Sequence, residues 1–343
     1  MSDADHLHGH RFCPSCFEAW PPPAELCPSD GATLVPIASP GRSLAGRLVD
    51  GKYMVTALLG RGGMGEVYRA RQLPMNREVA LKVLFPETLR DVNAVRRFVR
   101  EASAASRLHS RHVAMIHDFG ISREGFIYLV MELAEGRLLS DSLIPGAPFG
   151  LERSLHVAID VCRALEEAHA QGIVHRDLKP GNIILDSGDG HEIARVLDFG
   201  TAYVADTLEE ERVTADGKVF GTPAYMCPEQ AQGEEVDAWA DLYSLGIMLY
   251  EMLSGALPYT GKNHTAVLLA HINSTARPLR DLAPEVPQRL AALVEHLMAK
   301  HGRDRPAGAR RVRLELEEIL EETSGAPPQG HRRSRTVLRG LPP

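Results

Sequence analysis

Long hydrophobic runs are missing from this sequence: no apolar stretch approaches the roughly 18 residues that a membrane-spanning helix needs. Cysteine is scarce, with five in 343 residues, which excludes a disulfide-stabilised scaffold. The first ten residues are polar and rich in histidine, unlike a secretory signal peptide. These features predict a cytoplasmic protein without a membrane span.

Basic residues are not in excess either. Lys and Arg number 38 against 45 Asp and Glu, so the net charge of −7 gives no case for nucleic acid or an anionic membrane as the main partner. Hydrophobic residues make up 44% of the chain, which excludes a wholly disordered or fibrous protein. A chain of this length is expected to hold about two domains.

Turn-forming residues divide the chain into four parts. We assign residues 10–37 to a small N-terminal module, 38–46 to a linker, 47–320 to the main domain and 321–343 to a disordered basic tail. In the main domain, β-rich runs predict strands at 53–59, 66–70, 78–84 and 126–133. Helical periodicity predicts helices at 92–108, 151–171, 239–253, 265–271 and 288–300. Strands followed mainly by helices predict an α+β domain with two lobes.

A glycine-rich loop lies between the first two predicted strands. Gly60, Gly62 and Gly65 fit a G-x-G-x-x-G-x-V pattern, and the strand after it disfavours a dinucleotide-binding fold, which needs a helix there. Glycine lets the backbone approach phosphate oxygens and present its N–H groups. Lys82 on the next strand can reach two phosphates. It needs a counter-charge, and Glu101 on the following helix is the natural one.

The stretch from His175 to Asn182 carries the most chemical information. Asp177 can orient a hydroxyl nucleophile and accept its proton, and Asn182 offers a neutral oxygen to a hard cation. Asp198 begins an Asp-Phe-Gly sequence after a β-like run, where a carboxylate suits a Mg²⁺ that bridges phosphates. Because the glycine loop, the lysine and these two segments occur in one order, coincidence is negligible.

These motifs resemble those of the eukaryotic-like serine/threonine protein kinases of bacteria, and the resemblance covers residues 48–320. It implies a bilobal protein-kinase fold, with a small β-rich lobe, a larger helical lobe and ATP between them. It also implies transfer of the γ-phosphate of MgATP to Ser and Thr hydroxyls of protein substrates. The alternative is a pseudokinase scaffold that binds nucleotide and partner proteins, which the complete set of catalytic residues disfavours.

The resemblance also implies a role for each motif residue. Asp177 orients the substrate hydroxyl, Lys179 neutralises the transferring phosphate, and Lys82, paired with Glu101, holds the α- and β-phosphates. The glycines cover the phosphates, while Asn182 and Asp198 bind Mg²⁺. The residues expected to surround adenine are Leu59, Val67, Ala80, Met131 and Ile184, with the backbone of Glu132 and Leu133 bonding its edge.

Farther along, residues 221–229 resemble the substrate-docking end of a kinase activation segment, which runs from Asp198 to Glu229. Its last residue, Glu229, is expected to form a buried structural ion pair with Arg305. Arg176, before the catalytic aspartate, commonly awaits a phosphate on that segment. We expect Thr214 to be the regulatory phosphosite, with Asp216 as a permanent, weaker negative charge, and a homodimer to support autophosphorylation in trans.

Three cysteines crowd the N-terminal module. Cys13 and Cys16, then Cys27 and Asp30, lie in two Cys-Pro turns and resemble a short zinc ribbon that lacks its fourth cysteine. Asp30 can supply the fourth ligand, and the alternatives are His6, His8 or His10, or a degenerate site without metal. A module this small would need the metal for most of its stability, and we expect it to dock a partner or regulate the enzyme.

Overall fold

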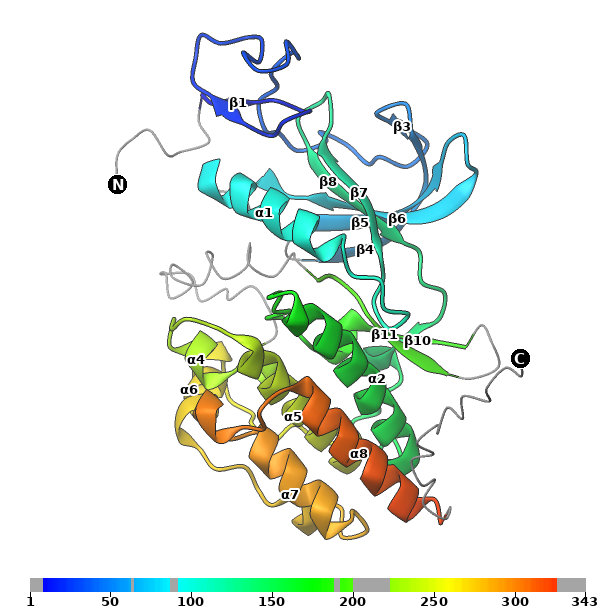
Figure 1. Cartoon of the computed structure of the whole chain (residues 1–343), viewed down its shortest axis with the longest axis vertical. Coiled ribbons are helices and arrows are strands. Elements are labelled where there is room, and N and C mark those ends of the chain that lie inside the picture. Colours follow the sequence, from blue (N-terminus) through cyan, green and yellow to red (C-terminus); the bar gives the residue numbers. More distant parts are fainter. Residues whose placement is uncertain (1–8, 63–64, 87–91, 188–191, 200–222, 326–343) are drawn as a thin grey trace, which may run out of the picture.

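The computed structural model describes residues 9–62, 65–86, 92–187, 192–199 and 223–325. A β-rich upper lobe lies above a larger helical lobe (Figure 1), which confirms the predicted bilobal protein-kinase fold. Among the described residues, no helix is long and apolar enough to cross a membrane.

The upper lobe is an antiparallel six-stranded sheet with one long helix against it. The strand order is β3-β4-β5-β6-β8-β7, and α1 packs on the sheet through a buried apolar stripe that includes Val95, Phe98 and Ala102. Strand β7 was not expected from the sequence, because His117 and Asp118 interrupt its apolar pattern. The elements are β3 (Leu48–Val49), β4 (Tyr53–Gly62), β5 (Gly65–Gln72), β6 (Arg77–Leu84), α1 (Val92–Ala105), β7 (Ile116–Ile121) and β8 (Ile127–Glu132).

The lower lobe is built around α5, whose side chains are buried along most of its length. Helix α8, which was not expected from the sequence, packs along α2. A three-stranded sheet, β11-β10-β9, lies at the boundary between the lobes and holds the catalytic segment (Figure 1). The elements are β9 (Arg137–Leu138), α2 (Leu151–Ala170), β10 (Ile183–Asp186), β11 (Ile193–Val196), α4 (Pro228–Ala231), α5 (Ala238–Ser254), α6 (His264–Asn273), α7 (Gln288–Leu297) and α8 (Ala309–Thr323).

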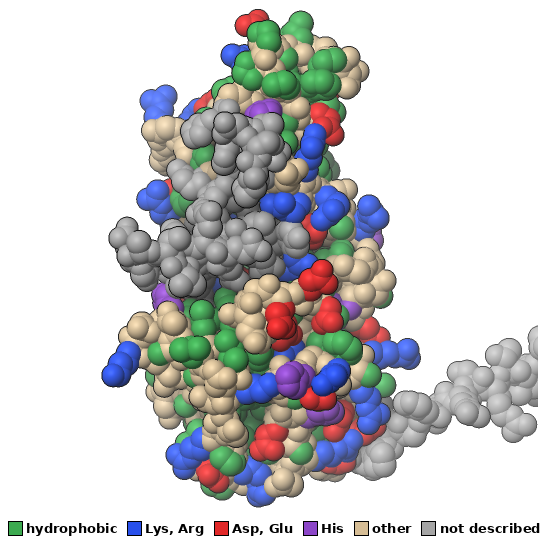
Figure 2. Space-filling model, turned by 90° about the vertical axis from the view of Figure 1, so that its left-hand side faces the viewer, with side chains coloured by type: hydrophobic (Ala, Val, Ile, Leu, Met, Phe, Trp, Pro, Cys, Tyr) green, Lys and Arg blue, Asp and Glu red, His purple; other side chains and the backbone are tan. Residues whose placement is uncertain are grey.

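The N-terminal module is a small hairpin, β1 (Arg11–Phe12) and β2 (Ala19–Trp20), followed by two irregular turns. It lies at the top of the molecule beside α1 (Figure 1), and its residue Phe12 belongs to the core of the upper lobe. Hydrophobic side chains gather at this end of the molecule (Figure 2), where Leu26 is 60% exposed. The module is therefore packed on the upper lobe, and its exposed end, the apolar tip, includes Leu26.

Candidate active site and metal site

Lys82 and Asp198 meet across the two lobes. The Lys82 side chain on β6 is buried, and its Nζ lies 2.8 Å from Oδ2 of Asp198. Asp198 has a φ of 62°, a left-handed conformation that is uncommon outside glycine. Burial opposes its ionisation, but the Lys82 ammonium outweighs this effect and holds the pKa of Asp198 below its usual value. Asp198 is therefore a carboxylate at neutral pH, as a metal ligand must be.

No ion pair joins Glu101 to Lys82 among the residues that the structure describes, so their pairing stays a prediction. The Glu101 carboxylate lies 3.6 Å from the Arg100 guanidinium, whereas Lys82 pairs with Asp198. The buried ammonium needs a counter-charge, and Asp198 supplies it from the other lobe. Glu101 lies on α1 next to Ala102, a member of the buried stripe of this helix.

The predicted catalytic residues form one compact group. Lys179 Nζ lies 2.9 and 2.6 Å from the two carboxylate oxygens of Asp177. The Asn182 amide nitrogen donates to the Asp177 carbonyl at 2.8 Å and to its Oδ2 at 3.2 Å. These contacts orient the Asp177 carboxylate and fix the Asn182 amide, so that its remaining oxygen is the group available to a cation.

A fully buried carboxylate, Asp241 of α5, anchors the catalytic loop. Its oxygens accept hydrogen bonds from the backbone N–H groups of His175 at 2.9 Å and Arg176 at 2.8 Å. Its Oδ2 also lies 2.7 Å from Nε2 of His169. Burial opposes the charge of Asp241, but the bond to His169 and the nearby charges lower its pKa overall. Arg176 itself has a left-handed φ of 64°, which these bonds hold in place.

Gln230 is a loop anchor that the sequence did not reveal. Its amide donates to the Arg176 carbonyl at 2.7 Å, while its oxygen lies 3.1 Å from the buried Cys227 thiol. The sequence around Gln230 gives no signal for this role; in the structure the side chain is buried in the short helix α4. Cys227 is thus part of the packing beneath the loop.

The three glycines of the loop differ in what surrounds them. At Gly65 an added Cβ would lie 2.0 Å from the Val83 carbonyl oxygen, so only glycine lets β5 and β6 approach this closely. At Gly60 and Gly62 nothing lies within 4 Å of such an atom, which leaves room for a ligand on that side.

Four of the predicted adenine contacts share one hydrophobic cluster. Two other predicted residues lie outside it: Leu59 is 48% exposed, and Ile184 is on the small lower sheet. The N–H of Glu132 donates to the Met115 carbonyl at 2.8 Å, so this donor is not available to adenine. The clustered residues are Val67, Ala80, Met131 and Leu133.

The predicted ion pair between Glu229 and Arg305 is present. The two carboxylate oxygens lie 2.6 and 2.8 Å from the two terminal guanidinium nitrogens, a bidentate arrangement. The Arg305 side chain is fully buried and also donates to three backbone carbonyls. This pair ties the end of the docking segment to the lower lobe.

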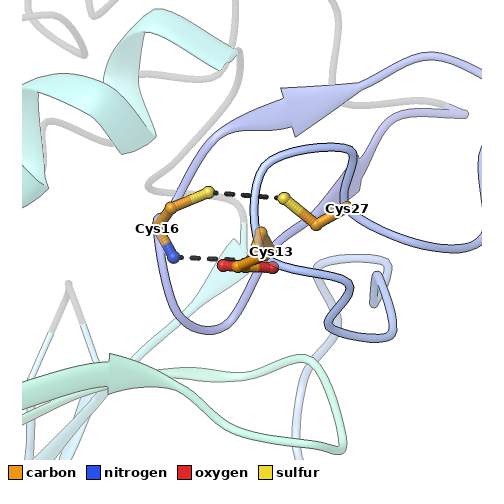
Figure 3. Close-up of side chains that lie close together, drawn as sticks. Cys13, Cys16 and Cys27 are labelled. Atoms are coloured by element: carbon orange, nitrogen blue, oxygen red, sulfur yellow. Dashed lines mark hydrogen bonds between the residues drawn. The ribbon is translucent and has the colours of Figure 1, made fainter.

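The N-terminal cysteines form a cluster with the geometry of a metal site. The ligand atoms of Cys13, Cys16, Cys27 and Asp30 all lie within 4.8 Å of one another. Cys16 and Cys27 point toward each other with sulfurs 3.6 Å apart (Figure 3), and Cys13 Sγ lies 3.2 Å from an Asp30 oxygen. Zn–S bonds of about 2.3 Å place tetrahedral sulfurs about 3.8 Å apart, so the donor set fits zinc.

Two further observations bear on this site. Burial raises the pKa of the Cys13 thiol to about 11, so a bound cation would be needed to hold it as a thiolate at neutral pH. His10 is not part of the cluster, which favours Asp30 as the fourth ligand over His10. His6 and His8 lie outside the described residues, as do Thr214, Asp216 and the basic tail beyond residue 325.

Comparison with known proteins agrees with this geometry. A family model described as the protein kinase domain matches residues 53–321. The serine/threonine-protein kinase pkn3 of Myxococcus xanthus is 36% identical over 303 residues, which cover 87% of this chain and 55% of the relative. PknB of Mycolicibacterium smegmatis is 36% identical over 297 residues, which cover 85% of this chain and 47% of the relative. The chain thus spans about half the length of these relatives.

A solved structure is similar over most of the chain. The kinase domain of PknI from Mycobacterium tuberculosis has a TM-score of 0.62 and 28% sequence identity, and the match covers 81% of this chain and 99% of that domain.

Proposed function

The chain belongs to the protein kinase family, among its bacterial serine/threonine-type members, and we propose that it transfers the γ-phosphate of MgATP to Ser and Thr hydroxyls of proteins. The observation that carries this proposal is the catalytic group itself. Asp177 is oriented by Lys179 and Asn182, and Lys82 is paired with Asp198. Phosphate incorporation from MgATP, followed by mass spectrometry, tests it.

In this proposal each side chain positions a group or balances its charge. Asp177 accepts the hydrogen bond of the substrate hydroxyl and then its proton, and Lys179 stabilises negative charge on the transferring phosphoryl group. Lys82 holds the α- and β-phosphates. Asp198 and the free oxygen of Asn182 would hold Mg²⁺, which neutralises phosphate charge when bound.

The alternative function is a scaffold that binds nucleotide and partner proteins without transferring phosphate. The complete catalytic group disfavours it, because a scaffold has no need for an oriented Asp177 carboxylate. The lack of a Glu101–Lys82 contact among the described residues does not decide between the two functions, because α1 can change position when nucleotide binds.

We also propose that phosphorylation of Thr214 activates the enzyme. Asp241 and Gln230 anchor the backbone of Arg176, and an arginine on such an anchored loop can pair with a phosphate on the activation segment. A carboxylate has less charge and fewer acceptor oxygens than a phosphate, so Asp216 should order the segment only in part.

Thr214→Ala is therefore expected to lower phosphate transfer without abolishing it, and the double variant with Asp216→Ala is expected to be less active still. Steady-state rates and phosphopeptide mapping measure both effects. Thr207→Ala, in the same segment, is the matched control and should retain full activity. If Thr214 is never phosphorylated and Thr214→Ala matches the wild type, this model of regulation is wrong.

We propose that the cysteine cluster binds one Zn²⁺ with a structural role, and that the module docks a protein partner through its apolar tip. Cys13→Ser or Cys27→Ser is expected to remove about one equivalent of zinc while the two lobes remain folded, because the module has only a small core of its own. Elemental analysis measures the zinc, and His10→Ala is the control that should retain it. Zinc-free wild-type protein prepared without chelator would favour the degenerate site instead.

A further inference from the structure

Phe12 of the N-terminal module is buried in the hydrophobic cluster on which α1 packs. Its side chain is fully buried and shares one hydrophobic cluster with Val95 and Phe98 of α1 and Leu129 of β8. Cys13, a ligand of the proposed zinc site, is the next residue in the chain. This fully buried residue of the module is thus adjacent to a proposed metal ligand.

Phe17 makes a second line of contact from the other end of the same turn. It follows Cys16 directly, and its ring centroid lies 5.4 Å from that of Phe119 on β7. Phe119 in turn lies edge-on to Phe98 of α1, with centroids 6.5 Å apart. Both aromatic anchors therefore flank the Cys13–Cys16 turn, and each is the sequence neighbour of one metal ligand.

Polar contacts fix the module at two further points. Glu18 pairs with Arg96 of α1 at 2.8 Å, although both side chains are about half exposed. Directly after the module, at the start of the linker, the Ala38 N–H donates to the Gly125 carbonyl at 3.0 Å, in the turn between β7 and β8. The module is thereby held against both α1 and the sheet on which α1 rests.

Glu101, the predicted partner of Lys82, lies on the same helix as these contacts. It lies three residues after Phe98, so the two side chains project from neighbouring positions on one side of α1. The described residues contain no Glu101–Lys82 ion pair. The position of α1 therefore influences whether this pair can form when nucleotide binds. If α1 loses part of its packing contacts, it must be ordered each time nucleotide binds, and this ordering costs free energy.

We propose that the metal-bound module positions α1 and so links zinc binding at its cysteines to nucleotide binding at Lys82. The inference rests on the zinc site and the ATP site proposed above. Phe12 and Phe17 are positioning residues in this scheme, because they act on nucleotide only through α1. Without metal the small module loses its order, the two anchors loosen, and α1 becomes more mobile.

Five proteins test this coupling: the wild type, Cys16→Ser, Phe17→Ala, its conservative counterpart Phe17→Leu and the control Leu26→Ala. Cys16 is an exposed ligand, Phe17 is an anchor but no ligand, and Leu26 is an exposed module residue. For each full-length protein we would measure zinc content, hydrogen exchange of the α1 amides and the Kd for magnesium with a non-hydrolysable ATP analogue.

Cys16→Ser is expected to lose zinc, whereas Phe17→Ala retains it. Both are expected to show faster exchange in α1 and a Kd raised by about fivefold or more, with unchanged stoichiometry of binding. Leu26→Ala should match the wild type, and Phe17→Leu should restore most of the affinity. A merely structural role would lower the number of binding sites and leave the Kd unchanged.

The proposal is overturned if Phe17→Ala leaves both the Kd and the α1 exchange at wild-type values. It is also overturned if the wild type holds no zinc, or if loss of zinc leaves the nucleotide affinity intact. None of these readouts requires phosphate transfer, so an inactive wild type would contradict the proposed function and leave this test valid.

Discussion

Asp177→Asn is expected to lower the rate of phosphate transfer by about 10²- to 10⁴-fold, the usual contribution of a positioned general base. Asparagine has the same size and can still contact Lys179 and Asn182, so the loop should keep its shape. It cannot accept the proton of the substrate hydroxyl, and it removes the negative charge that orients that hydroxyl. Initial rates with MgATP under single-turnover conditions measure the loss.

Lys82→Met is the companion variant, because it removes the contact with the phosphates from the other lobe. It also leaves the carboxylate of Asp198 without its 2.8 Å partner. The matched control for Asp177→Asn is Asp281→Asn, an acid-to-amide change at an exposed position of the lower lobe, which should keep wild-type activity. Unchanged phosphate transfer in folded Asp177→Asn protein would contradict the assignment of the catalytic residue.

Arg305→Ala is expected to lower the free energy of unfolding by about 3–5 kcal/mol, because it strands the Glu229 carboxylate in a largely buried site. The variant also removes the donors of three backbone carbonyls, which are then left without these bonds. Urea denaturation followed by circular dichroism measures the effect.

The matched control for this variant is Arg153→Ala. Arg153 also makes a bidentate pair, with Glu192 at 2.7 and 2.6 Å, but its side chain is 45% exposed. Solvent screens such a pair, so its removal should cost about 1 kcal/mol or less. Equal losses of stability in the two variants would show that burial does not determine the contribution of the Glu229–Arg305 pair.

Residues close together in sequence were the easiest to assign. Asp177 and Asn182 were predicted to share a site from one short segment, and the resemblance to kinases added Lys179; the structure brings all three together. The Glu229–Arg305 pair is far apart in sequence but was predicted from its motif, and the structure contains it.

Contacts that depend on how separate elements pack were not predictable from the sequence. The partner of Lys82 depends on the position of α1 relative to β6, and no local pattern reports that position. The contact of Phe17 with Phe119 likewise joins residues about a hundred positions apart, and in the sequence each reads as an ordinary apolar residue. The docking of the N-terminal module on α1 therefore became visible only in the structure.

The most direct test of the central claim is mass-spectrometric mapping of phosphosites after the purified chain is incubated with MgATP and an acceptor protein. We expect phosphate on Ser and Thr residues, none on Tyr, and no incorporation above background with the Asp177→Asn variant. Nucleotide binding without any transfer of phosphate, or transfer that persists in that variant, would contradict the account and favour the scaffold.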